Sequence, residues 1–165
     1  MNEEPQLVVF ILSVAGTFVA FAVLTRLYIW PALRKLPRFE ALKILALPHA
    51  FRFIGLSFLF PGVVSPELTS VISTPAAWGD FVAAILALLS IAALTWRWSF
   101  AIPLVWIFNV WGTIDLLYAY YNGIMLELEP GLFGAAFYIP TMIVPPLLVT
   151  HALIFLILLR TEKRQ

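Results

Sequence analysis

Residues 7–30 read LVVFILSVAGTFVAFAVLTRLYIW, an apolar run in which Arg26 is the one charged side chain. An α-helix rises about 1.5 Å per residue, so this run is long enough to cross the roughly 30 Å hydrocarbon core of a bilayer. Four further apolar stretches follow, at residues 44–60, 76–95, 100–121 and 135–159. We therefore predict an all-α integral membrane protein in which five transmembrane helices form one compact bundle, with residues 1–165 as a single domain.

The composition of the whole chain supports this interpretation. Hydrophobic residues make up 62% of the sequence and charged residues only 12%, whereas soluble domains carry about twice that charged fraction. In lipid, only helices and closed β-barrels satisfy every backbone hydrogen bond. Barrel strands alternate in polarity over about 10 residues, and the unbroken apolar runs of this chain exclude that pattern.

The charged residues of the predicted loops are separated by sign, and this separation predicts the topology. Every Lys and Arg except Arg52 falls on or next to one side: Arg26, Arg34, Lys35, Arg38, Lys43, Arg97, Arg160, Lys163 and Arg164. The opposite side carries only acidic charges: Glu3, Glu4, Glu67, Glu127 and Glu129. Because basic loops stay in the cytoplasm, we expect a multi-pass protein of the cell inner (cytoplasmic) membrane, with its N-terminus outside and its C-terminus in the cytoplasm.

Two features near the predicted span ends are expected to lie at the membrane surface. Residues 31–43 are basic and contain leucines, which favours either a segment lying along the headgroups or a basic loop that fixes the topology. Tyr120 and Tyr121 fall at the end of the fourth span, where aromatic rings commonly anchor a helix at the interface.

Charged residues inside the predicted spans are the first candidates for a functional site. Arg52 lies in the second span, Asp80 in the third and Asp115 in the fourth. A charge at the bilayer centre costs about 2.5–3.5 kcal/mol even on the mildest scale, so such residues usually pair with one another. We predict that Arg52 pairs with Asp80, with Asp115 or with both. The pairing would either belong to a site or only fix helix packing.

The fourth span presents a polar face. Trp111, Asp115, Tyr118 and Asn122 recur at helical spacing, and Asn109 lies on the flank of this stripe. An indole, a carboxylate, a phenol and an amide on one face predict the wall of a pocket for an amphipathic ligand. The alternative is an interior polar cluster that holds helices together.

Two histidines lie at similar predicted depth on different helices, His49 on the second span and His151 on the fifth. Such a pair is able to ligate a haem b through two axial imidazoles. It could also relay protons or donate a hydrogen bond to a quinone. The alternative is that each ring satisfies a nearby hydroxyl or carbonyl within the bundle.

The sequence lacks the motifs of several function classes. It contains no cysteine, no glycine-rich phosphate loop, no zinc-ligand spacing and no hydrolase nucleophile motif. We therefore expect no catalytic residue and no metal site, and no nucleic-acid partner because the basic residues flank spans.

Three functions remain open. The first is a non-enzymatic membrane protein that binds a hydrophobic or amphipathic molecule, such as a quinone, a porphyrin or a lipid, in an intramembrane polar pocket. The second is a small proton- or ion-coupled transporter that uses Asp80 and Asp115 with Arg52 as counter-ion. The third is an accessory subunit of a larger membrane complex. Expected partners are membrane lipids, a lipophilic small molecule, and a second copy or a larger complex.

Overall fold

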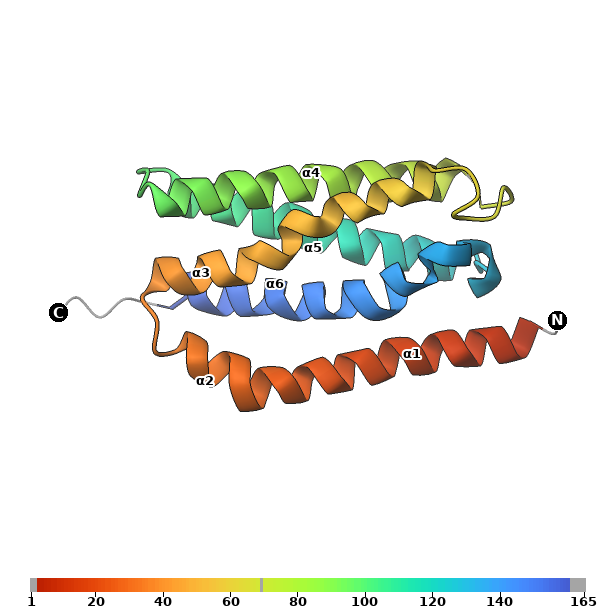
Figure 1. Cartoon of the computed structure of the whole chain (residues 1–165), viewed down its shortest axis with the longest axis horizontal. Helices are drawn as coiled ribbons and strands as arrows, with labels where there is room; N and C mark the ends of the chain where they lie inside the picture. Colours follow the sequence, from red (N-terminus) through yellow and green to blue (C-terminus); the bar gives the residue numbers. More distant parts are fainter. Residues whose placement is uncertain (1–2, 69, 161–165) are drawn as a thin grey trace.

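Long helices running back and forth along one axis make up the computed structural model, which describes residues 3–68 and 70–160 (Figure 1). Five helices are long and apolar enough to cross a membrane: Glu4–Leu33, Arg38–Leu59, Ile72–Thr95, Ala101–Met125 and Ile139–Leu158. The described residues form no β-strand. The predicted all-α fold with five such helices is therefore confirmed.

The first two apolar helices are joined by a shorter turn than the sequence suggested. The first consists of α1 (Glu3–Leu24), a π-helical turn η1 (Thr25–Ile29) and α2 (Trp30–Leu33). After Pro37, whose backbone is extended, α3 (Arg38–Ala46) begins the second helix. Residues 31–43 are therefore mostly helical rather than a simple loop. The physical reason is that Leu33 and Leu42 are buried against the bundle, only 4% and 0% exposed.

The second apolar helix changes its winding where it enters the bundle. Residues Leu47–Leu59 form η2, a 3₁₀ helix. A 3₁₀ helix has three residues per turn, so every third side chain lies on one face. That face is buried and consists of His49, Arg52, Gly55 and Phe58. The tighter winding therefore aligns an imidazole, a guanidinium and a glycine towards the interior.

The next two helices are regular. They are α4 (Ser70–Thr95) and α5 (Ala101–Met125). Alanines on α4 are almost fully buried, including Ala77, Ala83 and Ala87 at 0% exposure. Small side chains let helix backbones approach closely, and α4 packs against both η2 and α5.

The C-terminal helix begins irregularly. It is built from a 3₁₀ segment η3 (Pro130–Phe137), a π-helical turn η4 (Ile139–Ile143) and α6 (Val144–Leu158). The backbone of Gly134 has a φ of 51°, and a Cβ there would lie 2.5 Å from the carbonyl oxygen of Val63. Glycine is thus required where the loop before α4 meets η3. The hydrogen bond from the Ala135 N–H to the Val63 carbonyl, 2.8 Å long, fixes this contact.

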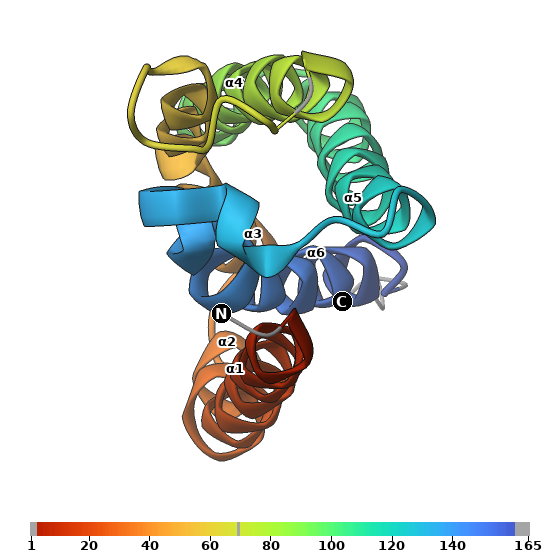
Figure 2. The same ribbon diagram turned by 90° about the vertical axis from the view of Figure 1, so that its right-hand side faces the viewer.

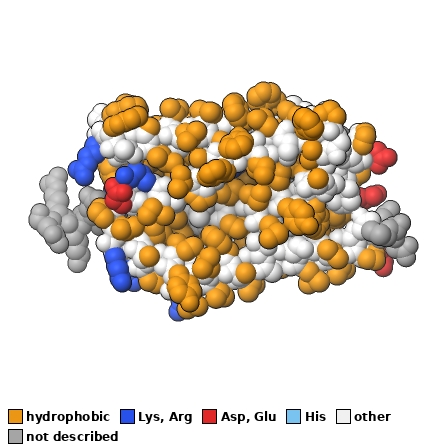
Figure 3. Space-filling view, viewed as in Figure 1, with side chains coloured by type: hydrophobic (Ala, Val, Ile, Leu, Met, Phe, Trp, Pro, Cys, Tyr) orange, Lys and Arg blue, Asp and Glu red, His pale blue; other side chains and the backbone are white. Residues whose placement is uncertain are grey.

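Helices η2, α4, α5 and α6 surround the interior, while α1 packs outside them against α6 and η4 (Figure 2). No described side chain of residues 4–24 is buried. Lys and Arg gather at one end of the molecule and most acidic side chains at the other, with an apolar surface between (Figure 3). The exception at the basic end is Glu40, which pairs with Lys43.

Two apolar clusters fill the interior. One, near the basic end, includes Leu42, Leu45, Leu94, Phe108 and Ile154. The other, near the acidic end, includes Phe58, Ala77, Leu116, Ile139 and Leu147. Each of the four inner helices carries buried polar residues that fall between these clusters in the sequence: His49 and Arg52, Asp80, Asn109, and Thr150 and His151. They therefore form a polar layer in the middle of the bundle.

Candidate ligand-binding site

Arg52 is the centre of the polar layer. Its Nε donates to Oδ1 of Asp80 at 2.7 Å, and its Nη2 donates to Oδ2 of Asp115 at 2.5 Å. The Arg52 side chain is 1% exposed, and those of Asp80 and Asp115 are 9% and 14% exposed. The structure thus brings together the three charged residues named above as site candidates, and Arg52 contacts both carboxylates. Charge-assisted bonds of this kind are the strongest hydrogen bonds in proteins.

Glycines on three helices make room for this ion cluster, by which we mean Arg52, Asp80 and Asp115. A Cβ at Gly55 would overlap the carboxylate of Asp80, and one at Gly79 would overlap that of Asp115. Each carboxylate therefore lies directly against a neighbouring backbone. The close approach explains why these polar groups fit into a tightly packed bundle.

Gly112 has the same role beside the guanidinium. Its carbonyl accepts a hydrogen bond from Nη1 of Arg52 at 3.2 Å. A Cβ at this position would lie 2.8 Å from Nη1 and 2.6 Å from the imidazole of His151. The same Nη1 lies 3.4 Å from Nε2 of His151. Each of the three guanidinium nitrogens therefore donates to a neighbouring group.

His151 is fixed by Asn109. The Asn109 Nδ2 donates to the backbone carbonyl of His151 at 3.2 Å, which turns the Asn109 Oδ1 towards Nδ1 of the imidazole, 2.7 Å away. Since an amide oxygen only accepts, Nδ1 of His151 carries the proton. Nε2 therefore presents its lone pair to Arg52. Both residues are buried, at 0% and 1% exposure.

His49 lies on the other side of His151. Its Nε2 is 2.9 Å from the hydroxyl of Thr150, which itself donates to the carbonyl of Leu147 at 2.9 Å. The hydroxyl proton is therefore used, so Nε2 of His49 must be the donor. Its Nδ1 is buried and has no hydrogen-bond partner among the residues that the structure describes.

The two histidines do not form a haem site. Their ring centroids are 4.0 Å apart and the rings are tilted by 46°. Axial ligation requires the porphyrin and its iron to lie between the two imidazoles, and rings already in contact leave no space for it. The structure therefore does not support the haem b hypothesis for His49 and His151.

A cavity of about 940 Å³ adjoins the ion cluster on the side of the acidic end. Asp80 and Asp115 form its floor, and most of the remaining lining is apolar, with Leu7 and Phe10 from α1, Leu116 from α5, and Phe133 and Ile139 from the C-terminal segment. Glu4, Glu127 and Glu129 line its mouth. From Asp115 to its last residue, Met125, α5 rises about 15 Å. The cavity is thus long, apolar along its walls and charged at both ends.

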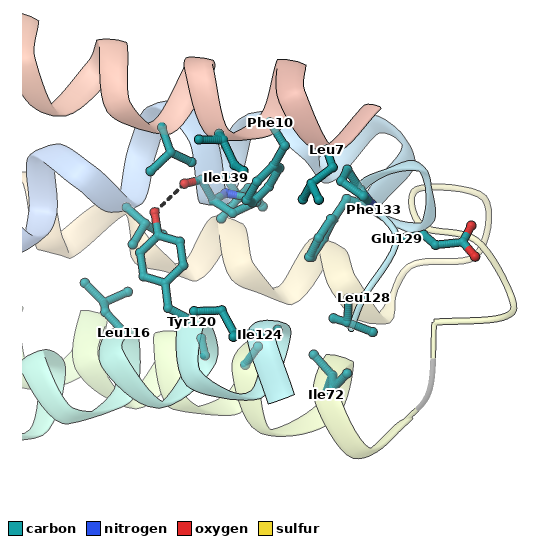
Figure 4. A pocket seen from close by; sticks show the side chains of 18 of the residues that line it. Leu7, Phe10, Ile72, Leu116, Tyr120, Ile124, Leu128, Glu129, Phe133 and Ile139 are labelled. Carbon is teal, nitrogen blue, oxygen red and sulfur yellow. Dashed lines mark hydrogen bonds between the residues drawn. The ribbon is translucent and has the colours of Figure 1, made fainter. Parts of the chain in front are cut away.

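Figure 4 shows how the cavity lies between α1 on one side and α5 on the other. Tyr120 projects into it, and its hydroxyl donates to the carbonyl of Pro140 at 2.6 Å. At the end of the π-helical turn the Val144 N–H bonds to the carbonyl of Ile139, and the next residue, Pro145, has no N–H. The carbonyl of Pro140 therefore lacks a helical donor, and the Tyr120 hydroxyl supplies one. The Phe10 ring of α1 stacks on the Phe133 ring of η3 with centroids 6.1 Å apart, so this pair joins the two elements along the cavity wall.

The predicted polar stripe of α5 is only partly directed at the cavity. Asp115 reaches it, but Trp111 and Tyr118 are 46% and 54% exposed on the outer surface. Asn122 bonds back to the carbonyl of Tyr118 within its own helix. Asn109 belongs to the polar layer rather than to the cavity. The lining face of α5 is instead formed by Leu116, Ala119, Tyr120 and Gly123 together with Asp115 and Ile124.

Comparison with known proteins identifies the family of the chain. Residues 9–159 match the family described as Domain of unknown function (DUF8737), and the chain belongs to this family. No curated protein and no solved structure matches the chain. A function therefore has to be inferred from the geometry and charges of the cavity.

Proposed function

We propose that this member of the DUF8737 family is a multi-pass membrane protein that binds an amphipathic small molecule in the cavity between α1 and α5. The observation that carries the proposal is the combination of long apolar walls with the ion cluster at the floor. Ligand pockets typically combine mainly apolar walls with a few well-placed polar groups. The volume of about 940 Å³ lies at the upper end of the usual range for such pockets.

The apolar surface between two charged ends supports insertion into a membrane (Figure 3). The end with Arg34, Lys35 and Arg97 would then face the cytoplasm, because loops rich in Lys and Arg remain on that side. In this orientation α1 starts outside, and the mouth of the cavity opens towards the outer surface. The inner membrane is the location that this orientation favours.

Entry from the lipid is supported by the wall that α1 contributes. Ile11 on α1 and Ile124 on α5 both line the cavity and are 54% and 69% exposed. The cavity therefore reaches the molecular surface at the side, between these two helices. An amphipathic molecule in the outer leaflet could enter there without passing through water.

Filling the cavity tests the proposal. A Cβ added at Gly123, which lines the cavity, would meet nothing within 4 Å, and the same holds for Gly16, which does not line it. We expect Gly123→Phe to abolish saturable binding of a radiolabelled dodecyl amphiphile to the protein in lipid nanodiscs. Gly16→Phe is the matched control and should bind as the unaltered protein does. Equal binding by both variants, or no saturable binding by the unaltered protein, would refute the proposed function.

Proton-coupled transport is the second candidate, and one observation favours it. The carboxylate of Asp115 lines the cavity and pairs with the buried Arg52. A proton or cation that enters the cavity could bind this carboxylate in place of its counter-ion Arg52. Acidification of proteoliposomes, followed with a trapped pH-sensitive dye, would show this flux. Asp115→Asn should abolish it, and a flux that persists would exclude Asp115 as a coupling group.

A further inference from the structure

The charged residues that line the cavity all have the same sign. Asp80 and Asp115 lie at its floor, Glu4, Glu127 and Glu129 lie at its mouth, and the described lining includes no Lys or Arg. We propose that the ligand is an amphipathic cation, with an amine or quaternary ammonium head at Asp115 and an apolar chain along the walls. This inference specifies the ligand class of the proposed function and rests on it.

The charge balance at the floor leaves one negative charge without compensation. Arg52 provides a single positive charge against the two carboxylates of Asp80 and Asp115. The guanidinium is 1% exposed, does not line the cavity and has all three nitrogens engaged. It is therefore not available to an anionic head group. Asp115, at 14% exposure, is the accessible charge.

Hydrogen-bond chemistry also argues against a neutral acceptor such as a quinone. An ionised carboxylate accepts hydrogen bonds and donates none. The neutral side-chain donor among the described lining residues is the Tyr120 hydroxyl, and it already donates to the carbonyl of Pro140. A quinone carbonyl would therefore find no free side-chain donor in the part of the lining that the structure describes. An ammonium group, in contrast, supplies the donors or the positive charge that the carboxylates lack.

The walls are suited to the remainder of such a ligand. They carry the aromatic rings of Phe10, Phe18, Phe58, Phe133 and Tyr120. A cation gains further stabilisation over an aromatic face when water is excluded. The acidic residues at the mouth would raise the local concentration of cations before entry. Both ends and the walls therefore favour the same class of ligand.

The experiment compares dodecyltrimethylammonium, dodecanol and dodecanoate, which share one chain and differ in head charge. We expect saturable binding in nanodiscs to be strongest for the cation. Asp115→Asn should weaken binding of the cation roughly tenfold or more, because it removes a charged partner. It should weaken binding of dodecanol less, because the amide oxygen of Asn still accepts a hydrogen bond from the hydroxyl. Asp115→Glu keeps the charge and should retain the preference. Glu67→Gln, which removes an exposed acidic group that does not line the cavity, is the matched control.

The outcomes separate this inference from the proposed function. Binding of all three amphiphiles with similar affinity, still blocked by Gly123→Phe, would overturn the cationic ligand and leave the cavity as a binding site. Stronger binding of dodecanoate would overturn it as well. Absence of saturable binding by any of the three would refute the proposed function together with the inference. Circular dichroism and size-exclusion chromatography of each variant establish that a lost signal does not reflect loss of the fold.

Discussion

Removing the positive charge of Arg52 is the most direct test of the ion cluster. We expect Arg52→Met to lower the free energy of unfolding by about 3–5 kcal/mol, the usual cost of breaking a buried ion pair by deleting one partner. Methionine keeps much of the length and apolar volume of the arginine stem. The loss therefore reports on charge and hydrogen bonding more than on packing.

The structure supports the upper part of this range. Arg52 lies at 2.7 Å and 2.5 Å from its two carboxylate partners and is only 1% exposed. Two unit charges about 4 Å apart attract by about 4 kcal/mol at an effective dielectric constant of about 20. Arg52 makes two such pairs, and its loss also leaves Asp80 and Asp115 to repel each other. Asp115 lines the cavity and is 14% exposed, so solvation of its carboxylate would offset part of this cost.

The assay is reversible unfolding in mixed micelles, followed by far-ultraviolet circular dichroism. The matched comparison is the triple variant Arg52→Met, Asp80→Leu, Asp115→Leu, which removes all three charges. Replacing a complete buried ion cluster with apolar side chains is often neutral or stabilising, so the triple variant should recover most of the stability. A loss below about 1 kcal/mol for Arg52→Met would refute the ion cluster described here. A triple variant as unstable as the single one would show that packing, rather than unpaired charge, dominates.

Three further predictions use the same unfolding assay. Asn109→Leu should cost about 1–3 kcal/mol, because the Nδ1–H and the backbone carbonyl of His151 lose their partner; an unchanged stability would contradict the assigned hydrogen bonds. Gly112→Ala should lower the free energy of unfolding by about 1–3 kcal/mol, because the added methyl group is overpacked against the imidazole of His151. Gly123→Ala places its methyl group in open space and should raise the free energy of unfolding by about 0.5 kcal/mol. Lys43→Ala breaks an exposed ion pair and should change stability by less than about 0.5 kcal/mol.

The five apolar helices could be predicted because each is a long run without compensating polar residues. The start of the second helix could not, since Arg38 and Lys43 read as loop charges. Their helix is held in place by Leu42 and Leu45, which pack into the interior, and by Arg38, whose Nη2 donates to the carbonyl of Leu158 at 2.8 Å. Lys43 lies at the surface, 23% exposed, and pairs with Glu40. Charge alone therefore does not distinguish a loop from the exposed face of a helix end.

The sequence predicts the charged residues of the candidate site, but it does not predict most of the residues that line the cavity. Arg52, Asp80 and Asp115 were identified because a charge within an apolar run requires a partner. The sequence predicts Tyr120 as an interfacial anchor because the apolar run ends at residue 121. The helix continues to Met125, which places the ring inside the cavity. The spacing of Leu116, Tyr120 and Gly123 at helical intervals is the signal that could have identified this face.

Other features depend on helix arrangement, which the sequence does not encode locally. His49 and His151 were expected at similar depth, but direct contact of their rings requires η2 and α6 to lie side by side. Trp111 and Tyr118 share a helix face with Asp115, yet they lie at its outer edge. At 3.6 residues per turn the stripe covers only about 60° of the helix circumference. The residues of α5 that line the cavity are centred on the neighbouring arc, so Asp115, at the edge of the stripe, is the member that reaches the cavity.

The 3₁₀ winding of η2 has a mechanical consequence. Its 13 residues extend about 26 Å at 2.0 Å per residue, whereas an α-helix of that length would extend about 20 Å. Between His49 and Phe58 the 3₁₀ helix makes about three full turns, and an α-helix would make about two and a half. Relaxation to α-helix would thus shorten the segment by about 6 Å and rotate Phe58 roughly half a turn away from the cavity that it lines. Arg52 links the same segment to α4 through Asp80 and to α5 through Asp115. The ion cluster would therefore oppose relaxation of the 3₁₀ helix and keep Phe58 in the wall of the cavity.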